Sequence, residues 1–175
     1  MTIKTIFLDR DGVINKEVHY LYKVDDFKFI DGIFKVCHIF NKLGYKIIIV
    51  TNQSGISRGI YSEIDYKILT NWMINQFNNH NVEILDVLHC PHESKSNCEC
   101  RKPKPGMFIK AKKKHSINMQ CSWMIGDKET DIESAQSAGI NNTILVRSGH
   151  FINESKSKAK FILNSIKQSS EIIIN

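Results

Sequence analysis

The sequence contains no apolar run of the length that crosses a membrane, which takes about 20 consecutive apolar residues. Its first residues lead directly into a β-branched run, so we expect no secretory signal. Hydrophobic residues make up 42% and charged residues 24% of 175 positions, which excludes a disordered or fibrous chain. We therefore expect a soluble cytoplasmic protein, without a membrane partner, that folds as a single domain over residues 1–175.

Two nucleotide-binding signatures are also missing. The phosphate-binding loop G-x-x-x-x-G-K-[ST] and the dinucleotide fingerprint G-x-G-x-x-G do not occur anywhere in the chain. Their absence argues against a nucleotide kinase and against a dehydrogenase.

Acidic residues are outnumbered, and the formal net charge is +6. Most of the excess is lysine, with the densest runs at residues 110–114 and 156–160. We interpret these runs as solvated faces rather than as a nucleic-acid interface. A small anionic substrate would suit a basic protein equally well.

Strand and helix patterns alternate along the chain. Strands are predicted at residues 2–7, 46–50, 84–88, 122–125 and 143–146. Strands separated by helices indicate an α/β fold, a Rossmann-like parallel sheet with helices on both faces. Such sheets carry their active sites beyond the carboxyl ends of the strands.

The predicted helices have recognisable starts and apolar faces. One runs from Asp31 as N-cap towards Gly44, and another follows the capping box of residues 62–65. A third follows Pro105 and a fourth follows Asp127, with a last helix after a short apolar piece at residues 161–163. The apolar face of the second helix is predicted to comprise Ile64, Ile68, Leu69, Trp72, Met73 and Phe77.

Two aspartates follow the first predicted strand, where the chain turns at Gly12. Side chains alternate along a strand, so Asp9 and Asp11 are expected on one side and Arg10 on the other. Two carboxylates this close need compensation, and Mg²⁺ is common where carboxylates are few and the substrate carries phosphate. Taken alone, the string could equally be a polar turn.

Polar residues follow the other strands as well. Thr51 begins a loop whose hydroxyl, amide and backbone donors suit phosphate oxygens. Arg101 and Lys102 add positive charge, and Asp127 with Asp131 could complete a metal site. Because these strand ends should share one edge of the sheet, the sequence predicts a phosphoryl-transfer site with a carboxylate nucleophile.

A cysteine cluster lies between the third strand and the third helix. Its pattern is C-x-H-x5-C-x-C, which suits one tetrahedral Zn²⁺ held by Cys90, His92, Cys98 and Cys100. Four protein ligands close the site, so the zinc is expected to be structural. We hypothesise that it fixes the loop that carries Arg101 and Lys102. The remaining two, Cys37 and Cys121, are interpreted as packing residues.

These motifs together resemble those of the haloacid dehalogenase phosphatases. The resemblance rests on Asp-x-Asp-Gly, Thr51, Lys102 and Gly126-Asp127 with Asp131. Longer strings are similar to the family of D-glycero-D-manno-heptose 1,7-bisphosphate 7-phosphatases over nearly the whole chain. Those strings are residues 9–12, 51–56, 90–92, 98–107 and 126–128.

The resemblance implies roles for individual residues. Asp9 would be the nucleophile that forms an aspartyl-phosphate, and Asp11 the general acid and base. Mg²⁺ would bind the Asp9 side chain, the Asp11 backbone carbonyl and Asp127, while Thr51 and Lys102 stabilise the phosphoryl group. The residues expected to bind the substrate are Glu17, Val18, His19, Tyr20, Asn52, Gln53, Ser54, Arg101 and Lys128.

The sequence shows no inserted cap domain, which suggests an open site for a small phosphorylated sugar, in a chain expected to be a monomer. Three alternatives remain. Histidinol-phosphate phosphatases share the motifs and the zinc loop, and Arg101, Lys102 and Lys128 favour a doubly phosphorylated sugar over them. DNA 3′-phosphatases share the aspartate and Thr-Asn-Gln strings but give no reason for a zinc loop. A non-catalytic zinc-bearing binding module leaves the strand-end residues unexplained.

Overall fold

The computed structural model describes residues 2–174 and contains one parallel sheet. Its strands are β1 (Thr5–Leu8), β2 (Lys46–Asn52), β3 (Ile84–Cys90), β4 (Trp123–Gly126), β5 (Asn142–Val146) and β6 (Phe161–Leu163). They lie in the order β3-β2-β1-β4-β5-β6, and every neighbouring pair is parallel. The predicted α/β class is confirmed. The piece at residues 161–163 adds a sixth strand that its three residues were too few to predict.

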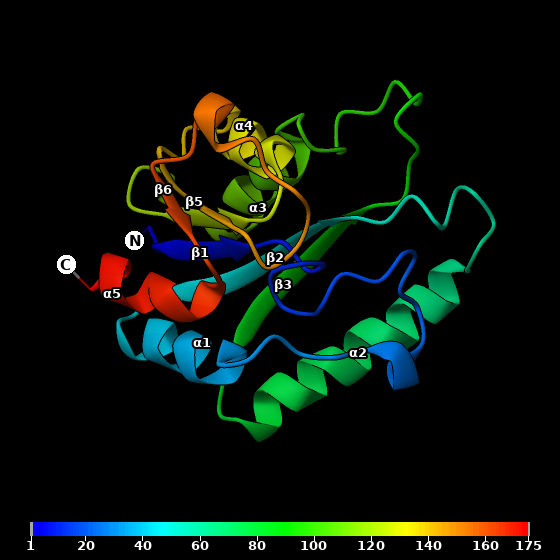
Figure 1. Cartoon of the computed structure of the whole chain (residues 1–175), viewed down its shortest axis with the longest axis horizontal. Coiled ribbons are helices and arrows are strands. Elements are labelled where there is room, and N and C mark those ends of the chain that lie inside the picture. The colour runs from blue at the N-terminus through cyan, green and yellow to red at the C-terminus, as the bar shows by residue number, and fades with distance from the viewer. Residues whose placement is uncertain (1, 175) are drawn as a thin grey trace.

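Helices cover both faces of this sheet (Figure 1). One face carries α1 (Ile33–Lys42), α2 (Glu63–Asn79) and α5 (Ser169–Ile173), and the other carries α3 (Gly106–His115) and α4 (Glu129–Ser137). Short 3₁₀ turns occupy Val24–Asp26, Glu154–Lys156 and Ile166–Gln168. No helix within residues 2–174 is both long and apolar enough to span a membrane.

Successive side chains of the central strands enter two separate cores. Ile6 and Leu8 of β1 pack on the α1 side, whereas Phe7 packs with Phe108 of α3. Residues 47–50 of β2 are fully buried because both faces of that strand are covered. The sheet is therefore rigid where it ends, and its carboxyl edge is a fixed platform for polar side chains.

The N-termini of α1 and α2 can be compared with the predicted N-caps. At α2 the predicted capping box is confirmed, with Asp65 N–H donating to Ser62 Oγ and Ser62 N–H to Asp65 Oδ2. At α1 the prediction was wrong, because Gly32 occupies the N-cap at φ +81° without a side-chain cap. Asp31 instead pairs with Lys167 at 2.8 Å, next to the C-terminal helix.

The apolar face of α2 was predicted only in part. Leu69, Met73 and Phe77 are buried, but Ile64 and Ile68 are 69% and 58% exposed. Tyr66 and Thr70 take the buried positions instead. Both sets fit a helical period, and only the packing of α2 against the edge strand β3 decides between them.

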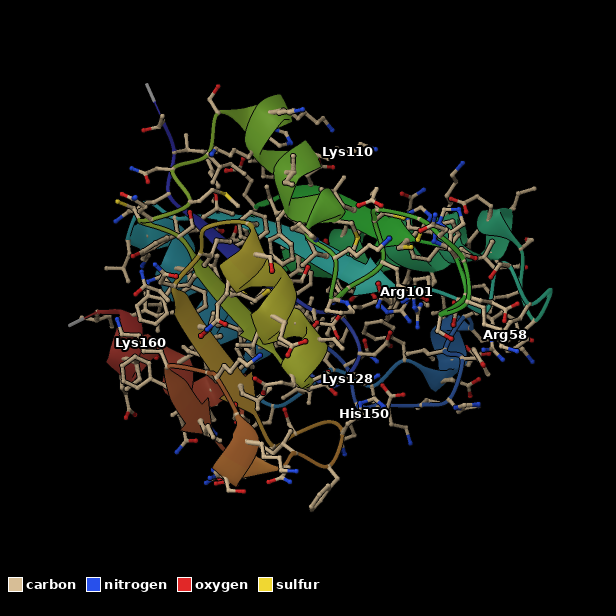
Figure 2. All side chains as sticks on the ribbon, turned by 90° about the horizontal axis from the view of Figure 1, so that it is seen from above. Arg58, Arg101, Lys110, Lys128, His150 and Lys160 are labelled. Carbon is tan, nitrogen blue, oxygen red and sulfur yellow. The ribbon has the colours of Figure 1, made fainter. Side chains whose placement is uncertain are left out.

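Two further predictions concern the cysteines and lysines outside the strand ends. Cys37 is buried as predicted, whereas Cys121 is exposed and does not pack. The lysine runs lie on exposed surface, and Figure 2 shows Lys110 and Lys160 well apart from Arg101, Lys128 and His150. The charge that faces the site therefore comes from other residues.

Candidate active site

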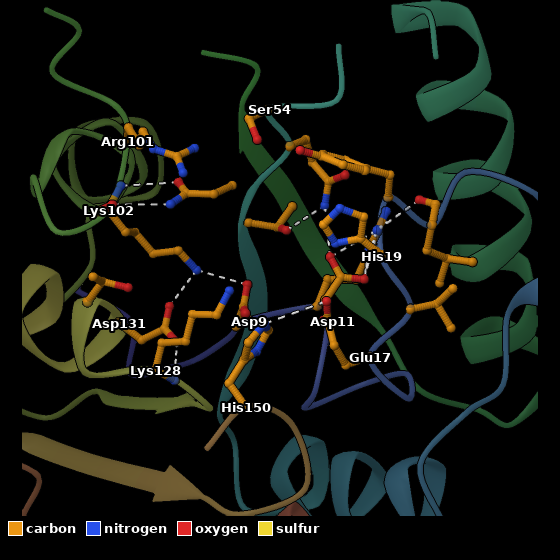
Figure 3. Close-up of a pocket in the computed structure, with 18 of the residues that line it drawn as sticks. Asp9, Asp11, Glu17, His19, Ser54, Arg101, Lys102, Lys128, Asp131 and His150 are labelled. Atoms are coloured by element: carbon orange, nitrogen blue, oxygen red, sulfur yellow. Dashed lines mark hydrogen bonds and ion pairs between the residues drawn. The ribbon is translucent and has the colours of Figure 1, made fainter. Parts of the chain in front are cut away.

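A cavity of about 350 Å³ opens at the carboxyl edge of the sheet (Figure 3). The sequence prediction placed Asp9, Asp11, Thr51 and Lys102 there, and all four line it. Every residue that the sequence predicts to bind substrate lines it too. Those residues are Glu17, Val18, His19, Tyr20, Asn52, Gln53, Ser54, Arg101 and Lys128.

Asp9 lies on the floor of the cavity, immediately after β1, and is 7% exposed. Its N–H donates to Ile125 O of β4, which fixes the backbone at the strand end. Burial raises the pKa of Asp9 well above its ordinary value; Lys102 lowers it, and Asp131, Asp127 and Asp11 raise it further. An ionised Asp9 therefore depends on nearby positive charge.

Lys102 supplies part of that charge. Its ammonium group donates to Asp9 Oδ1 at 2.8 Å and to Val50 O at 2.8 Å, and it pairs with Asp131 Oδ1 at 2.6 Å. Burial opposes this charge, but Asp131 and Asp9 outweigh it and raise the pKa of Lys102. Two hydrogen bonds with Asn52, one in each direction, hold the Lys102 backbone at 3.1 Å. Lys102 is thus a fixed cation rather than a mobile one.

Asp127 directly follows β4 and is fully buried, and it is not among the residues that line the cavity. Its Oδ2 accepts hydrogen bonds from the His150 backbone and ring, whereas its Oδ1 is buried without a partner among residues 2–174. Carboxylate oxygens of Asp9, Asp127 and Asp131 lie within 4.8 Å of one another. Hard oxygen donors, excess negative charge and one unsatisfied oxygen are what Mg²⁺ requires, so these residues fit that ion.

Two glycines make room for the Asp127 carboxylate. A Cβ on Gly12 would lie 2.4 Å from Asp127 Oδ2, and one on Gly149 would lie 2.0 Å from it. Gly12 also has φ +86°, a left-handed conformation that side chains rarely adopt. The close approach of both backbones explains why small residues follow β1 and β5 here.

Gly12→Ala is expected to lower the free energy of unfolding by at least about 2 kcal/mol, because it combines left-handed strain with overpacking against Asp127. Gly59→Ala is the matched control, since Gly59 has φ +68° but no atom within 4 Å of an added Cβ. The control should lose only about 1 kcal/mol. Urea unfolding measures both, and equal losses would contradict the contact with Asp127.

Asp11 has a different environment from Asp9. Arg10 Nη2 lies 2.8 Å from its Oδ1 and 2.9 Å from its Oδ2, and Asn15 and Gln53 also donate to it. Burial opposes the charge of Arg10, yet Asp11 raises the pKa of this guanidinium. The prediction that Arg10 points away from the aspartates was wrong, because the strand ends at Leu8 and its alternation stops there.

Gln53 is buried and connects three groups of the site. Its amide donates to Thr51 Oγ1 at 2.8 Å and to Asp11 Oδ2 at 3.1 Å, and its carbonyl accepts from Tyr61 Oη at 2.6 Å. Burial raises the pKa of Tyr61 to about 12, so this hydroxyl remains a donor. Gln53 therefore orients Asp11 and Thr51 relative to each other.

The predicted zinc ligands also come together. The ligand atoms of Cys90, His92, Cys98 and Cys100 lie within 4.8 Å of one another, and the Cys90 and Cys98 sulfurs are 3.7 Å apart. Tetrahedral Zn²⁺ with Zn–S of about 2.3 Å separates its sulfurs by roughly 3.8 Å. The Cys90–Cys98 pair matches this separation, whereas the Cys90 and Cys100 sulfurs are 2.8 Å apart and would move apart to bind the ion. All five cysteines are free thiols, so all three cysteines of the cluster are available as ligands. The donor set fits structural zinc.

The cysteine cluster touches the active site through Arg101. The Arg101 Nη1 group donates to the backbone carbonyl of His92 at 2.9 Å. Arg101, a predicted substrate-binding residue, is thus anchored to His92, a predicted zinc ligand. Arg58 also reaches the same loop, 3.5 Å from Glu93. The loop between β3 and α3 is thereby tied to the cavity rim.

The sequence reasoning did not single out Arg10, Tyr61 or His150 as site residues. Arg10 and Tyr61 act through Asp11 and Gln53, contacts that no local pattern indicates. His150 lines the cavity from the loop after β5 and contacts Asp127, which lies 23 positions away. Only the placement of these loops at one sheet edge could have suggested them.

The buried Asp9 carboxylate, the buried lysine and the acidic cluster at this sheet edge are the arrangement expected of a phosphatase of the haloacid dehalogenase superfamily. A HAD-hydrolase-like family model matches residues 99–169. D-glycero-alpha-D-manno-heptose-1,7-bisphosphate 7-phosphatase of Photorhabdus laumondii is 45% identical over 98% of this chain and 97% of its own length. The corresponding beta-anomer enzyme of Vibrio cholerae is 42% identical over 95% and 94%.

A solved structure agrees with the fold. The D,D-heptose 1,7-bisphosphate phosphatase from B. bronchiseptica, complexed with magnesium and phosphate, superposes with a TM-score of 0.86. The superposition covers 98% of both chains at 23% sequence identity, so it supports the fold alone. From its sequence relatives, the chain belongs to the family of D-glycero-D-manno-heptose-1,7-bisphosphate 7-phosphatases.

Proposed function

We propose that this protein hydrolyses the 7-phosphate of D-glycero-D-manno-heptose 1,7-bisphosphate, leaving heptose 1-phosphate for nucleotide-activated heptose and lipopolysaccharide core synthesis. The observation that carries the proposal is the buried Asp9 carboxylate at the cavity floor, held by Lys102. The proposal includes a cytoplasmic location and a monomer with one domain over residues 1–175. Its relatives include enzymes named for the alpha and for the beta anomer, so the anomer is left to experiment.

In the proposed reaction, Asp9 attacks the phosphorus of the 7-phosphate. The bond from phosphorus to the C7 oxygen breaks, and that oxygen takes a proton from Asp11. Water then attacks the phosphorus of the aspartyl-phosphate and gives a proton back to Asp11, and inorganic phosphate leaves Asp9. The assignment of Asp9 as the nucleophile is supported by its position beside Lys102, Asp127 and Asp131.

Asp11 suits the role of general acid and base because its hydrogen-bond partners differ from those of Asp9. Arg10, Asn15 and Gln53 only donate to it, so in this structure it is the acceptor that a general base must be. Its side chain is 20% exposed, whereas that of Asp9 is 10% exposed, and water reaches it more easily. To act as the acid in the first step, Asp11 must be protonated. The protonated oxygen then gives up one of the hydrogen bonds that it accepts from Arg10, Asn15 or Gln53.

Mg²⁺ would be held by the carboxylates of Asp9 and Asp127 and by the Asp11 backbone carbonyl. When bound, it offsets negative charge on the transferring phosphoryl group. Asp131 is better explained as the partner of Lys102 and of the Asp127 and Lys128 amides than as a ligand. Thr51 and Lys102 supply the remaining donors for the phosphoryl oxygens.

A second phosphate on the substrate is supported by the cations along the cavity. Arg101 and Lys128 line it in addition to Lys102, and neither is paired with a carboxylate in the described chain. Histidinol phosphate carries a positively charged amine instead, which these two side chains would repel. The arrangement favours a sugar bisphosphate over that alternative.

Loss of zinc is expected to lower kcat/KM, because Arg101 loses its anchor on His92. Cys98→Ser should release the bound zinc and reduce kcat/KM on the order of 10-fold or more. Metal content and phosphate release measure the two effects on the same sample. Cys121→Ser, at the exposed cysteine outside the cluster, is the control. Zinc loss with unchanged turnover would contradict the role assigned to this loop.

The proposed activity is tested by phosphate release in the presence of Mg²⁺. The experiment would compare kcat/KM for both anomers of heptose 1,7-bisphosphate with kcat/KM for histidinol phosphate and for a 3′-phosphorylated oligonucleotide. The proposal expects a strong preference for one bisphosphate anomer, with the 1-phosphate retained in the product by phosphorus NMR. A preference for histidinol phosphate or the oligonucleotide would reassign the substrate, and no turnover of any of them would overturn the proposal.

A further inference from the structure

The side chain of His150 contacts both the acidic cluster, at Asp127, and the predicted substrate-binding segment, at Glu17. It follows Gly149 after β5 and lines the cavity. Its Nδ1 lies 2.6 Å from Asp127 Oδ2, and its Nε2 lies 3.7 Å from Glu17 Oε1. Figure 3 shows the ring below Asp9, at the edge of the pocket opposite Arg101.

The contacts at Asp127 are divided between its two oxygens. Oδ2 accepts from both His150 N–H at 3.0 Å and His150 Nδ1, and the glycine backbones of Gly12 and Gly149 enclose it. Because a carboxylate oxygen only accepts, Nδ1 carries the proton of this hydrogen bond. Oδ1 is buried and has no partner among residues 2–174. One oxygen is thus held by the protein, and the other is left available.

The loop that carries His150 is itself fixed to the first aspartate loop. Ser148 Oγ donates to Gly12 O at 2.6 Å, which ties residues 148–150 to residues 9–12. The ring is 36% exposed on its outer side, which means that it contributes little to the core. Its position is therefore better explained by Asp127 than by packing.

We propose that His150 is a positioning residue that orients Asp127 for Mg²⁺. The Nδ1 hydrogen bond holds Oδ2 and leaves the buried Oδ1 available to the ion. The inference rests on the proposed function, since it concerns the same metal site. Groups that orient metal ligands in this way are typically worth a factor of about 10 to 100 in metal affinity.

The test measures metal binding without any substrate. Mn²⁺ serves as the probe for the Mg²⁺ site, because its free ion gives an electron paramagnetic resonance signal that disappears on binding. His150→Ala is expected to raise the Kd for Mn²⁺ by about 10-fold or more. His150→Asn should stay within about 3-fold of the wild type, because its amide can donate from the place of Nδ1. His150→Gln, whose amide reaches the place of Nε2, should behave like the alanine variant.

His115→Ala is the matched control, since His115 makes a similar pair with Asp86 at 2.8 Å, outside the cavity. It should leave the Kd unchanged. Equal Kd values for His150→Ala and the wild type would overturn the inference and leave the proposed function intact. Asp127→Asn separates the two claims: if it binds Mn²⁺ as the wild type does, the metal site itself is wrong, and both fall.

Discussion

Asp9→Asn is expected to lower kcat by roughly 10⁴-fold or more, because an amide cannot form the aspartyl-phosphate. The fold should survive this change. Burial and three neighbouring carboxylates raise the pKa of Asp9, so its ionised form costs the folded state free energy that a neutral side chain avoids. We therefore expect the free energy of unfolding to be unchanged or higher.

Phosphate release and urea unfolding of the same Asp9→Asn preparation measure the two effects. Asp25→Asn, at an exposed aspartate in the same half of the chain, is the control and should retain full activity. An Asp9→Asn protein that still turns over at a tenth of the wild-type rate would mean that Asp9 is not the nucleophile.

Lys102→Met is expected to damage both stability and activity. Lys102 is 4% exposed and neutralises Asp9 and Asp131, so its loss leaves these two buried carboxylates without the cation that compensates them. Breaking a buried ion pair in this way costs about 3–5 kcal/mol, and loss of a donor to the transferring phosphoryl lowers kcat by about 10²–10³-fold.

A double variant separates the two contributions of Lys102. If the cost in stability comes from the unpaired charge on Asp9, Asp9→Asn should restore part of the free energy of unfolding that Lys102→Met removes. Activity should not return. A Lys102→Met protein within about 1 kcal/mol of the wild type would contradict the buried pairing, because such pairs are costly to break.

Much of this site could be predicted because a parallel sheet places its strand ends together. Asp9 and Asp127 directly follow β1 and β4, Thr51 and Cys90 lie at the carboxyl ends of β2 and β3, and the parallel order of these strands brings all four to one edge. The clustering of Cys90, His92, Cys98 and Cys100 was predictable for another reason, since their spacing is local. Both kinds of signal can be read from one sequence without any knowledge of packing.

The parts that escaped prediction depend on contacts between loops. Arg10 was assigned to the wrong side because the alternation of the strand was carried past its last residue, Leu8. His150 has its partner on another loop, and nothing in its local sequence distinguishes it from a surface histidine. Ile64 and Ile68 were also placed wrongly. Their spacing fits a helical apolar face, but both side chains are exposed to solvent.

The distribution of charge explains how one edge of the sheet can hold four aspartates. Asp11 is compensated by Arg10, and Asp9 and Asp131 share Lys102. Within residues 2–174, Asp127 pairs with no lysine or arginine, and its Oδ1 has no hydrogen-bond partner. The remaining negative charge is therefore concentrated where Mg²⁺ is proposed to bind.

The most direct test of the central claim is to look for the phosphoryl group on Asp9. Wild-type protein is mixed with heptose 1,7-bisphosphate and Mg²⁺, quenched in acid during turnover, digested, and analysed by mass spectrometry. The account predicts one added phosphoryl group on the peptide that contains Asp9, and none in the Asp9→Asn variant. Phosphate release without any modified peptide, or with the phosphoryl group on another residue, would contradict it.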